Sequence, residues 1–579
     1  MARSAVAGTS RKRKDAPAFP PFPRRFAPEG LDAGSKQALD PLFMDLEERP
    51  LATPEDLVRW LEDWSELASV VAEEESRRYI DHTCHTDDPG TEKRYLEFQR
   101  EIVPFVKPRW QHLKQKFAAA PHRTQIDPER YQVFNRTILN EVELFREDNV
   151  PLETRDAELV AEWQKITGAM MVYFDGKDRT LPQVSRALEE TDRARREKAW
   201  RGIATRRLRD RDPIDAIYDE MVRNRDRRAR IAGFANFRDY TFREKGRFDY
   251  TPDDCRRYHD AVAELVVPAL RRLHERRRKK LKLKALRPWD LAVDPEGAAP
   301  LRPFAKVTEL VAGARDIFAR VDPSLAKLFE AIRDRGNLDL DSRKGKAPGG
   351  YQCTLDAQRV PFIFMNAAGL QRDVVTLLHE GGHAFHAILC RGDSLVLYRQ
   401  APMEFCEVAS MGMEALGSAH LEVFYGKADA VRARRVWFEE ILRIFPWIAT
   451  IDAFQHEVYL RPDATAADRR AMWLKERRRF KGGDDWSGLE EEHASSWHAQ
   501  NHPFTVPFYY IEYAIAQIGA LQIWRNARKD RAKALEKYRT ALALGGSRPL
   551  PELFRAAGIK FGMDAKTLKP LIQAVEAEL

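Results

Sequence analysis

Cysteine is scarce in this chain of 579 residues, which contains only five. They are odd in number and widely spaced, so they offer no paired framework of the kind that stabilises small secreted domains: Cys84, Cys255, Cys353, Cys390 and Cys406. We therefore expect reduced thiols, which are typical of a cytoplasmic protein.

Long hydrophobic runs are also missing. No segment has the roughly 18 consecutive apolar residues that a membrane-spanning helix needs. The basic residues Arg24 and Arg25 are not followed by the roughly 7 to 15 apolar residues of a secretory signal. These observations predict a cytoplasmic protein with no membrane partner.

Acidic residues are nearly absent from the first 25 positions. That segment carries +6 of the total formal charge of +8, which leaves +2 for the rest of the chain. Its Pro-, Ala- and Arg/Lys-rich composition predicts a disordered tail over residues 1–28. Elsewhere basic residues are mostly interleaved with acidic ones, which argues against nucleic acid as a partner. The run from Arg271 to Lys284 is the exception and could attract an anionic surface.

The composition indicates a large, mainly helical protein. Hydrophobic residues make up 44% of the chain and charged residues 32%. Long charged stretches with helical periodicity occur at 187–211, 252–283 and 307–332. We therefore predict a mainly α fold, with an N-terminal helical region over residues 29–200 and a second region over 201–579.

The sequence His379-Glu380-Gly-Gly-His383 lies inside an apolar stretch. Residues four apart share one face of a helix, so both imidazoles could bind one Zn²⁺. Glu380 follows the first His directly and could act as the base toward a water held by that metal. The two glycines each lower helix propensity by about 1 kcal/mol relative to Ala. They imply either close approach of substrate or backbone to the metal, or a tight helix crossing.

A catalytic zinc needs a third protein ligand. Two glutamates on a downstream helical segment, Glu404 and Glu407, have suitable spacing, and the residues alone do not choose between them. Glu414 lies two turns after Glu407 on nearly the same face, where it could orient a ligand His.

Leu377-Leu-His-Glu-Gly-Gly-His-Ala-Phe-His386, followed by Glu404-Phe-Cys-Glu407-Val-Ala-Ser410, resembles segments of the thimet oligopeptidase and oligoendopeptidase F family of zinc metallopeptidases. The resemblance implies that Glu407 is the third ligand. It also implies an elongated, two-lobed helical metallopeptidase with a deep central channel, zinc at the channel floor and a small β-sheet near residues 338–369.

Upstream residues extend the resemblance. Gly349-Gly350-Tyr351-Gln-Cys353 and the segment 359–366 are similar to the family's glycine-flanked strand beside the cleft. The resemblance assigns Gly349, Gly350 and Tyr351 to substrate binding, because an extended peptide could pair with such a strand. On the residues alone, 360–365 could equally be a buried structural strand.

The segment from His502 to Trp524 resembles the His and Tyr cluster of the same family. A phenol or imidazole donor could stabilise the negative charge that develops on a peptide carbonyl oxygen. The resemblance aligns Tyr513 with the carbonyl-polarising Tyr, with Tyr510 and His502 as further donors and Tyr509 in substrate contact. Tyrosines at a helix start are also common core residues.

These observations predict a zinc metalloendopeptidase with one Zn²⁺, whose catalytic region is 201–579 and whose substrates are short oligopeptides. A zinc carboxypeptidase is an alternative, because a cationic side chain could capture a terminal carboxylate. A further alternative is a non-catalytic peptide- or nucleic-acid-binding protein on the same scaffold. The oligomeric state is open, with a monomer as the default expectation.

Overall fold

Helices form most of the computed structural model, which describes residues 19–347 and 349–579, and this confirms the prediction of a mainly α fold. The helices of the first third are α1 (Lys36–Glu48), α2 (Pro54–Cys84), α3 (Pro89–Glu97), α4 (Val103–Ala119), α5 (Pro128–Leu144) and α6 (Val150–Gly168). The next are α7 (Leu181–Ser185), α8 (Arg193–Arg209), α9 (Arg211–Ile231), α10 (Phe237–Glu244), α11 (Pro252–Ala261), α12 (Val267–Lys280), α13 (Val307–Val321) and α14 (Pro323–Asp334).

The last part of the chain is also helical. Its elements are α15 (Gln371–Leu389), α16 (Met403–Gly417), α17 (Lys427–Leu460), α18 (Ala466–Arg479), α19 (Glu490–Ala494), α20 (His502–Thr505), α21 (Tyr510–Lys529), α22 (Arg531–Ala543), α23 (Leu550–Ala556) and α24 (Ala565–Glu576). Among them, α16 packs closely against both α15 and α21.

Polar caps fix where many of these helices begin. The Thr53 hydroxyl accepts the backbone N–H of Asp56, and the Asp56 carboxylate accepts the N–H of Thr53. Thr251 and Asp254 form the same reciprocal cap at the start of α11. Each such cap is worth about 1 kcal/mol, so local sequence sets the start of α2 and α11.

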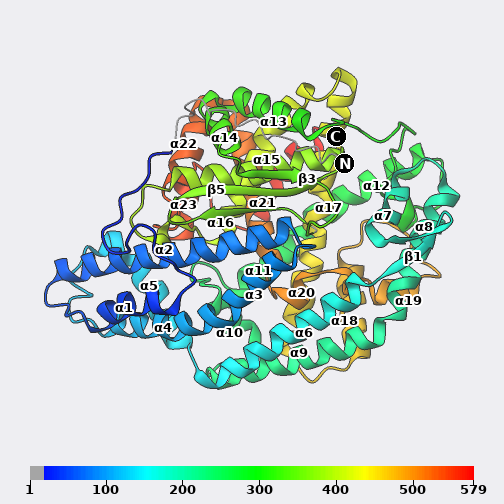
Figure 1. Cartoon of the computed structure of the whole chain (residues 1–579). Coiled ribbons are helices and arrows are strands. Elements are labelled where there is room, and N and C mark those ends of the chain that lie inside the picture. The colour runs from blue at the N-terminus through cyan, green and yellow to red at the C-terminus, as the bar shows by residue number, and fades with distance from the viewer. Residues whose placement is uncertain (1–18, 348) are drawn as a thin grey trace, which may run out of the picture.

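A small three-stranded sheet stands beside α15. It contains β3 (Leu338–Asp341), β4 (Tyr351–Leu355) and β5 (Val360–Ala367) in the order β3-β5-β4. β3 runs parallel to β5, and β4 pairs antiparallel with β5 in a register that places Tyr351 opposite Phe364. In Figure 1, α13, α14 and α15 lie above this sheet and α2 lies below it. The predicted sheet near residues 338–369 is therefore confirmed; a separate hairpin joins β1 (Met171–Phe174) and β2 (Lys177–Thr180).

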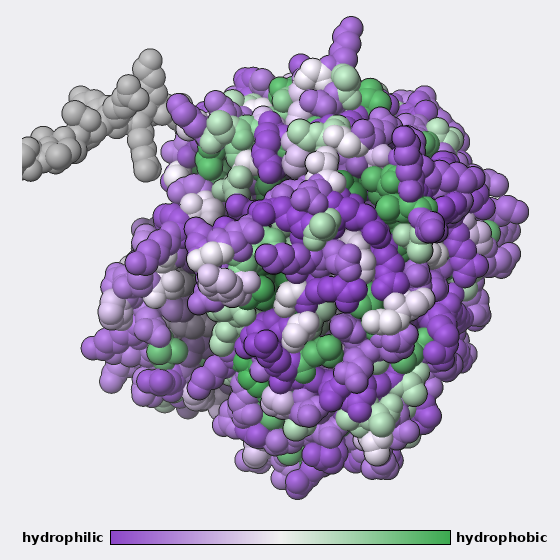
Figure 2. Space-filling view, turned by 90° about the vertical axis from the view of Figure 1, so that its right-hand side faces the viewer, coloured by the Kyte–Doolittle hydropathy of each residue, from purple (hydrophilic) through white to green (hydrophobic). Residues whose placement is uncertain are grey.

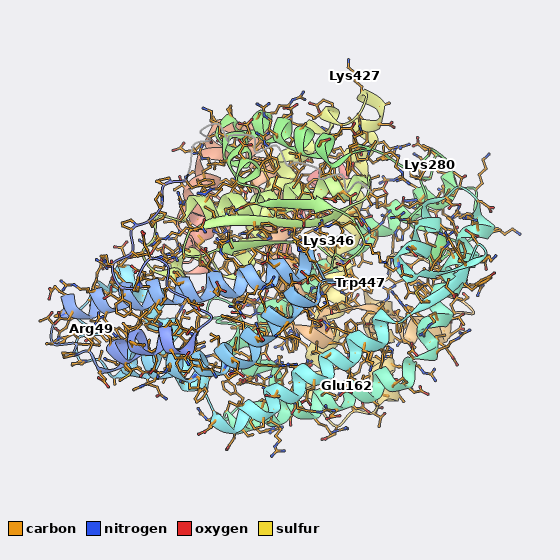
Figure 3. The ribbon with its side chains drawn as sticks, in the orientation of Figure 1. Arg49, Glu162, Lys280, Lys346, Lys427 and Trp447 are labelled. Carbon is orange, nitrogen blue, oxygen red and sulfur yellow. The ribbon has the colours of Figure 1, made fainter. Side chains whose placement is uncertain are left out.

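Lys346 holds the connection between β3 and β4 in place. Its side chain is fully buried, and Nζ donates to the Asp339 carboxylate at 2.9 Å and to the Asp341 carbonyl at 2.9 Å. Figure 3 shows Lys346 beside the sheet, whereas Lys280 and Lys427 lie at the edge of the molecule. A buried ammonium needs such partners, so Lys346 is fastened to β3 and to the residue that ends it.

The hydrophobic core falls into two large parts and one small part. One part gathers side chains from residues 27–138 with Leu395 and Tyr398. The main part includes residues from α6 onward and surrounds α15, α16, α17 and α21. The small part lies around the β1–β2 hairpin. Because residues 144–170 contribute to the main part, the core does not separate at residue 200, and that proposed boundary stays a prediction.

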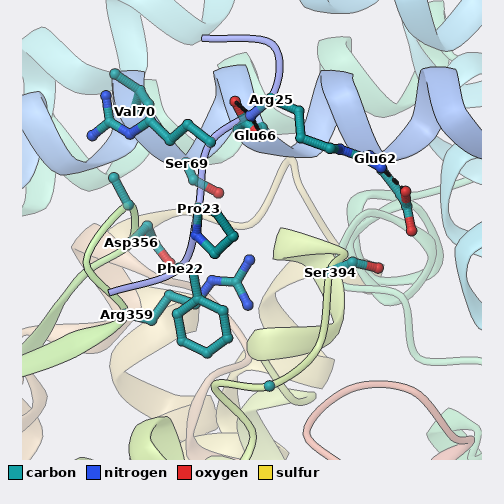
Figure 4. A pocket seen from close by; sticks show the side chains of 13 residues that line it. Phe22, Pro23, Arg25, Glu62, Glu66, Ser69, Val70, Asp356, Arg359 and Ser394 are labelled. Atoms are coloured by element: carbon teal, nitrogen blue, oxygen red, sulfur yellow. Dashed lines mark hydrogen bonds and ion pairs between the residues drawn. The ribbon is translucent and has the colours of Figure 1, made fainter. Parts of the chain in front are cut away.

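The N-terminal segment 19–28 is packed against the body, although the composition predicts a disordered tail up to residue 28. Phe22 covers the Arg359 guanidinium at 3.8 Å from its ring centroid, and Ala27 is 1% exposed. Figure 4 shows this segment crossing α2 above a pocket of about 290 Å³. Aromatic and backbone contacts thus hold residues 19–28, while residues 1–18 of the predicted tail lie outside the described residues.

Most of the face in Figure 2 is hydrophilic, and hydrophobic side chains appear in small separate patches. Within 19–347 and 349–579, the apolar stretches of the helices all fall short of what a bilayer crossing requires.

Candidate metal centre and active site

Two helices bring the predicted ligands together. His379 and His383 lie one turn apart on α15, and Glu407 lies on α16. The Glu407 Oε2 is 3.3 Å from His379 Nε2 and 3.7 Å from His383 Nε2. One ligand atom from each of the three residues lies within 4.8 Å of the other two. The motif and the downstream glutamate therefore form one cluster.

The donor set and its spacing fit zinc. Bonds of about 2.0 to 2.2 Å in a tetrahedral shell separate ligand atoms by roughly 3.3 to 3.6 Å, close to the two distances above. His379 Nδ1 lies 2.6 Å from Glu414 Oε1, so Glu414 can accept the Nδ1 proton and leave Nε2 as the metal-facing nitrogen. The sequence-based expectation that Glu414 orients a ligand His agrees with this contact.

The carboxylates control the protonation of this cluster. Burial lowers the pKa of His383 to about 4, so its imidazole is neutral. Burial also lowers the pKa of His379, but hydrogen bonds to Glu407 and Glu414 outweigh it and raise that pKa well above its ordinary value. Burial raises the pKa of Glu407, yet His379 outweighs it and the pKa falls to about 2. Glu407 is thus an anion ready to bind a cation.

The glycines of the motif serve a tight helix crossing. A Cβ on Gly382 would lie 2.6 Å from the Ala409 carbonyl oxygen and from Ser410 Cα, both on the backbone of α16. A Cβ on Gly381 would lie 2.6 Å from the Phe318 ring. Of the two explanations open from the sequence, close packing of helices is the one that these contacts support. Gly382 lets α16 approach α15 closely enough for Glu407 to reach the histidines.

Glu380 lies between the two histidines in sequence and is 6% exposed. Burial raises its pKa to about 7, and a hydrogen bond from the backbone of Gln352 opposes that rise. Gln352 belongs to β4, which is an edge strand in the sheet order. A carboxylate with a pKa near neutrality suits a group that both accepts and donates a proton.

Glu404, the other candidate from the sequence, points elsewhere. Its Oε1 accepts a hydrogen bond of 2.7 Å from the Tyr250 hydroxyl. Arg247, also buried, pairs with Glu512 next to it at 2.7 Å. Glu404 therefore belongs to a buried network of α16, α21 and the connection between α10 and α11, and not to the His379 cluster.

The aromatic cluster predicted after His502 packs against the metal-binding candidates. The Tyr509 hydroxyl donates to Glu407 Oε1 at 3.0 Å, and the Tyr509 ring lies 5.1 Å from the Tyr513 ring. The His502 ring lies 5.4 Å from Tyr509 and 6.0 Å from Tyr513. Burial raises the pKa of both phenols, with Glu407 adding to the effect, so both keep their protons.

Tyr510 packs against the His502 side of this group. Its ring contacts His502 edge-on at 4.8 Å, and burial raises its pKa to about 12 while Trp447 and Gln500 partly oppose the rise through hydrogen bonds. Trp447, labelled near the middle of Figure 3, donates to Gln500 Oε1 at 3.2 Å. Gln500 Nε2 is 3.2 Å from His502 Nδ1. Sequence reasoning missed Trp447 and Gln500, because nothing in their local pattern marks them.

The predicted substrate strand has two distinct parts. Tyr351 is fixed between α2 and β5: its hydroxyl is 2.6 Å from Thr83 Oγ1, and its ring stacks on Phe364 at 4.7 Å. Its contacts therefore lead away from the His379 cluster. Gly349 has a φ of +104°, which favours glycine, and Gly350 passes close to Thr376 of α15. Gln352 of the same strand, to which the sequence assigned no role, lowers the pKa of Glu380 through its backbone.

A pocket of about 670 Å³ lies next to the metal-binding candidates, on the side of Glu414. Glu414 and Met411 of α16, Gln371 and Thr376 of α15, and Trp437 of α17 contribute to its wall. The Trp437 Nε1 donates to Glu414 Oε2 at 3.4 Å. Glu414 therefore contacts the proposed ligand His379 and also lines this pocket.

Comparisons with known proteins link this chain and its fold to a peptidase family. The sequence profile of peptidase family M3 matches residues 186–572. Oligoendopeptidase F, chromosomal, from Lactococcus lactis subsp. cremoris is 27% identical over 145 residues, which are 25% of this chain and only 23% of that protein. A structure of Pz peptidase A with an inhibitor has a TM-score of 0.86 at 27% identity and covers 96% of this chain and 98% of its own.

A structure described as an oligoendopeptidase F has a TM-score of 0.87 at 28% identity, covering 97% of this chain and 98% of its own. These matches agree with the resemblance seen in the motifs and with the shared helical fold. Because the profile spans well over half of the sequence, the chain belongs to peptidase family M3.

Proposed function

We propose that this protein is a zinc-dependent endopeptidase that hydrolyses internal bonds of short peptides. The observation that carries the proposal is the approach of His379, His383 and Glu407 to within 4.8 Å of one another, with Glu380 on the same helix. Membership of a peptidase family supports peptide hydrolysis as the reaction.

His379, His383 and Glu407 would hold the zinc ion. When bound, zinc supplies Lewis acidity, which polarises a peptide carbonyl and makes a water molecule more acidic. Glu380 accepts the proton of the attacking water and then gives it to the leaving amine. Its raised pKa, about 7, suits both directions of transfer.

The surrounding residues keep these groups in position. Glu414 accepts the Nδ1 proton of His379 and so fixes the tautomer and the ring orientation. Ser410 donates to Glu407 Oε2 at 2.9 Å, and Tyr509 donates to Oε1 of the same carboxylate. Glu407 is therefore held from both of its oxygens.

The oxyanion of the reaction would be stabilised by neutral donors. Tyr513 and His502 both pack against Tyr509, and the high pKa of Tyr513 keeps its proton available for donation. A donor aimed at the developing charge typically lowers the barrier by about 2.7 to 4 kcal/mol. We assign this role to Tyr513 with His502, while Tyr510 supports His502 from behind.

Substrate would lie as an extended strand along β4. One edge of β4 pairs with β5, and β4 packs against α15, the helix that carries the catalytic carboxylate of Glu380. Pairing with a strand edge binds peptides through their main chain and tolerates varied side chains. The restriction to short peptides rests on the deep channel that the family resemblance implies.

The test is cleavage of an internally quenched peptide library by the native protein and by Glu380→Gln, with mass analysis of the fragments. We expect internal cuts whose rate falls by about 10² to 10⁴-fold in the variant, with metal content unchanged. Glu536→Gln is the matched control, because the Glu536 side chain is exposed on the surface of α22. Equal activity in Glu380→Gln would reject the assigned base.

A second comparison separates endopeptidase from carboxypeptidase. The same peptides with an amidated C-terminus keep every internal bond but lose the terminal carboxylate. An endopeptidase cuts both sets at the same bonds with similar kcat/KM. Loss of cleavage on amidation would favour the carboxypeptidase.

A further inference from the structure

A second group of metal-binding side chains lies away from the α15–α16 crossing. Cys255 and His259 are four residues apart on α11, and Asp452 and His456 are four residues apart on α17. The two helices pack against each other, so each presents one pair to the other. Their exposed fractions are 0%, 2%, 0% and 7% in the order given.

The atoms of this group are close enough to share an ion. Ligand atoms of Cys255, Asp452 and His456 lie within 4.8 Å of one another. His259 Nε2 is 2.8 Å from Asp452 Oδ2, and His456 Nε2 is 3.3 Å from the same oxygen. His259 therefore holds one oxygen of Asp452, while the other oxygen is left for a different partner.

Some polar atoms of this group lack a hydrogen-bond partner among the described residues. Asp452 Oδ1 and His456 Nδ1 are buried and have no hydrogen-bond partner in 19–347 and 349–579, and the only polar contact of His456 Nε2 there is Asp452 Oδ2 at 3.3 Å. A buried polar group without a partner costs about 1 to 3 kcal/mol. Two such atoms at one place point to a ligand that binds oxygen and nitrogen together.

The shell around the group is aromatic. Phe508 and Phe242 contact the His456 ring at 5.4 and 6.1 Å, and Phe480 contacts the His259 ring at 6.3 Å. In such surroundings a net charge is costly. A Cys thiolate and an Asp carboxylate together carry the two negative charges that balance a divalent cation, and a neutral His completes the donor set.

We infer that Cys255 Sγ, Asp452 Oδ1 and a His456 ring nitrogen bind a second zinc ion between α11 and α17, with His259 orienting the carboxylate. Sulfur, nitrogen and oxygen donors together are characteristic of zinc sites. Ligating carboxylates are commonly held by a hydrogen bond to their other oxygen, as His259 holds Asp452 Oδ2 here. On binding, the Cys255 thiol loses its proton to solvent and the sulfur–zinc bond forms without any change of oxidation state.

This ion would brace the loop that carries the aromatic cluster. Gln455, next to His456, accepts the Phe508 backbone N–H at 2.9 Å. Phe508 has a φ of +60°, a strained conformation for a large side chain, and it directly precedes Tyr509. The second ion would therefore stabilise the backbone turn that presents Tyr509 to Glu407. The inference itself stands on α11 and α17 and does not depend on the proposed peptidase activity.

The first experiment counts bound metal in a His379→Ala/His383→Ala protein, purified without chelators, by inductively coupled plasma mass spectrometry. This variant removes two ligands of the first site and leaves α11 and α17 intact. We expect about one zinc ion per chain in it, against about two in the native protein. Adding Cys255→Ala should remove the remaining ion, whereas adding Cys390→Ala, a buried cysteine at the end of α15, should not.

The second experiment identifies the sulfur ligand without altering the cluster. The His379→Ala/His383→Ala protein is refolded with Co²⁺, which should give an intense near-ultraviolet thiolate-to-cobalt band. No retained metal in this protein, retention after Cys255→Ala, or a cobalt spectrum without the thiolate band would each overturn the inference. Because the cobalt test keeps Cys255, it decides the question even if the Cys255→Ala chain does not fold.

Discussion

At the scale of single residues, the half-buried Glu414 and the buried Glu404 offer two carboxylates on α16 for comparison. Glu414 contacts His379 Nδ1 at 2.6 Å, whereas Glu404 accepts from Tyr250 at 2.7 Å. Glu414→Gln should weaken zinc affinity by about 10- to 100-fold, because a neutral amide stabilises the ligand tautomer less. Glu404→Gln should leave the affinity unchanged. Competition with a chromophoric chelator measures both, and equal affinities would contradict the positioning role of Glu414.

The two tyrosines nearest the cluster should differ in what they control. Tyr513→Phe should lower kcat/KM by about 10² to 10³-fold with metal affinity intact, because it removes a donor to the developing oxyanion. Tyr509→Phe should weaken zinc binding, because its hydroxyl donates to Glu407. Steady-state kinetics at saturating zinc separates these effects. If Tyr509→Phe alone lost kcat with zinc fully bound, the oxyanion role would belong to Tyr509.

The sequence alone predicts those residues whose role follows from their local spacing. His379 and His383 follow from their separation of four, and Glu414 follows from its helical face relative to Glu407. The choice of Glu407 over Glu404 needed the family resemblance, because both lie on one helical segment and both are buried. Only packing distinguishes them, because the Tyr250 hydroxyl donates a hydrogen bond to Glu404.

Other residues were out of reach for a different reason. Gln352 meets Glu380 only because β4 and α15 fold together. Cys255 and His259 meet Asp452 and His456 across almost 200 residues of sequence. The paired spacing of four in each segment was the available signal, and its meaning appears only when α11 faces α17.

At the scale of elements, the crossing of α15 and α16 depends on Gly382. A methyl group there would meet backbone atoms of Ala409 and Ser410 at 2.6 Å, and backbone cannot move aside as a flexible side chain can. Gly382→Ala should therefore destabilise the fold by about 1 to 3 kcal/mol and displace Glu407 from the histidines. Thermal unfolding and zinc content measure the two effects.

Gly168→Ala is the control for that prediction. Gly168 ends α6, and nothing lies within 4 Å of an added Cβ. Alanine is the better helix former by about 1 kcal/mol, so this variant should unfold at the same temperature or slightly higher. A Gly382→Ala protein with native stability and full zinc content would show that α16 can shift without loss.

Prolines explain where two of the three predicted helical stretches divide. The stretch 307–332 is α13 and α14, which meet at Asp322 because Pro323 begins the second helix. The stretch 252–283 is α11 and α12 joined by a π-helical turn at Val262–Val266, just before Pro268. A proline has no backbone N–H to donate to the preceding turn, so the helix changes its hydrogen-bonding pattern there. Periodicity predicted the helices, and proline chemistry sets their divisions.

At the scale of the whole molecule, composition predicted the mainly helical class but misplaced the start of the packed body. The segment 19–28 looked disordered because it is rich in proline and arginine and has little periodicity. Its order comes from partners far along the chain: Phe22 on Arg359, and backbone groups on Glu66 of α2. Such partners carry no signal in the segment's own sequence.

The same segment supports a prediction about how the N-terminal side is fastened. Glu66 Oε1 accepts the backbone N–H groups of Arg25, Phe26 and Ala27 at 3.1, 2.9 and 2.7 Å. Glu66→Ala leaves these groups without their acceptor, so hydrogen exchange at residues 25–27 should accelerate by about 10-fold or more, in line with the 1.5 to 3 kcal/mol of a hydrogen bond to a charged group.

Glu62 provides the comparison, because it lies one turn earlier on the same helix and in the same pocket (Figure 4). It pairs with the half-exposed Arg25 guanidinium at 2.7 Å and makes no backbone bonds to 25–27. An exposed ion pair contributes about 0 to 1 kcal/mol, so Glu62→Ala should leave exchange at 25–27 nearly unchanged. Equal acceleration in both variants would mean that charge attraction to Arg25, and not the three backbone bonds to Glu66, holds the segment on α2.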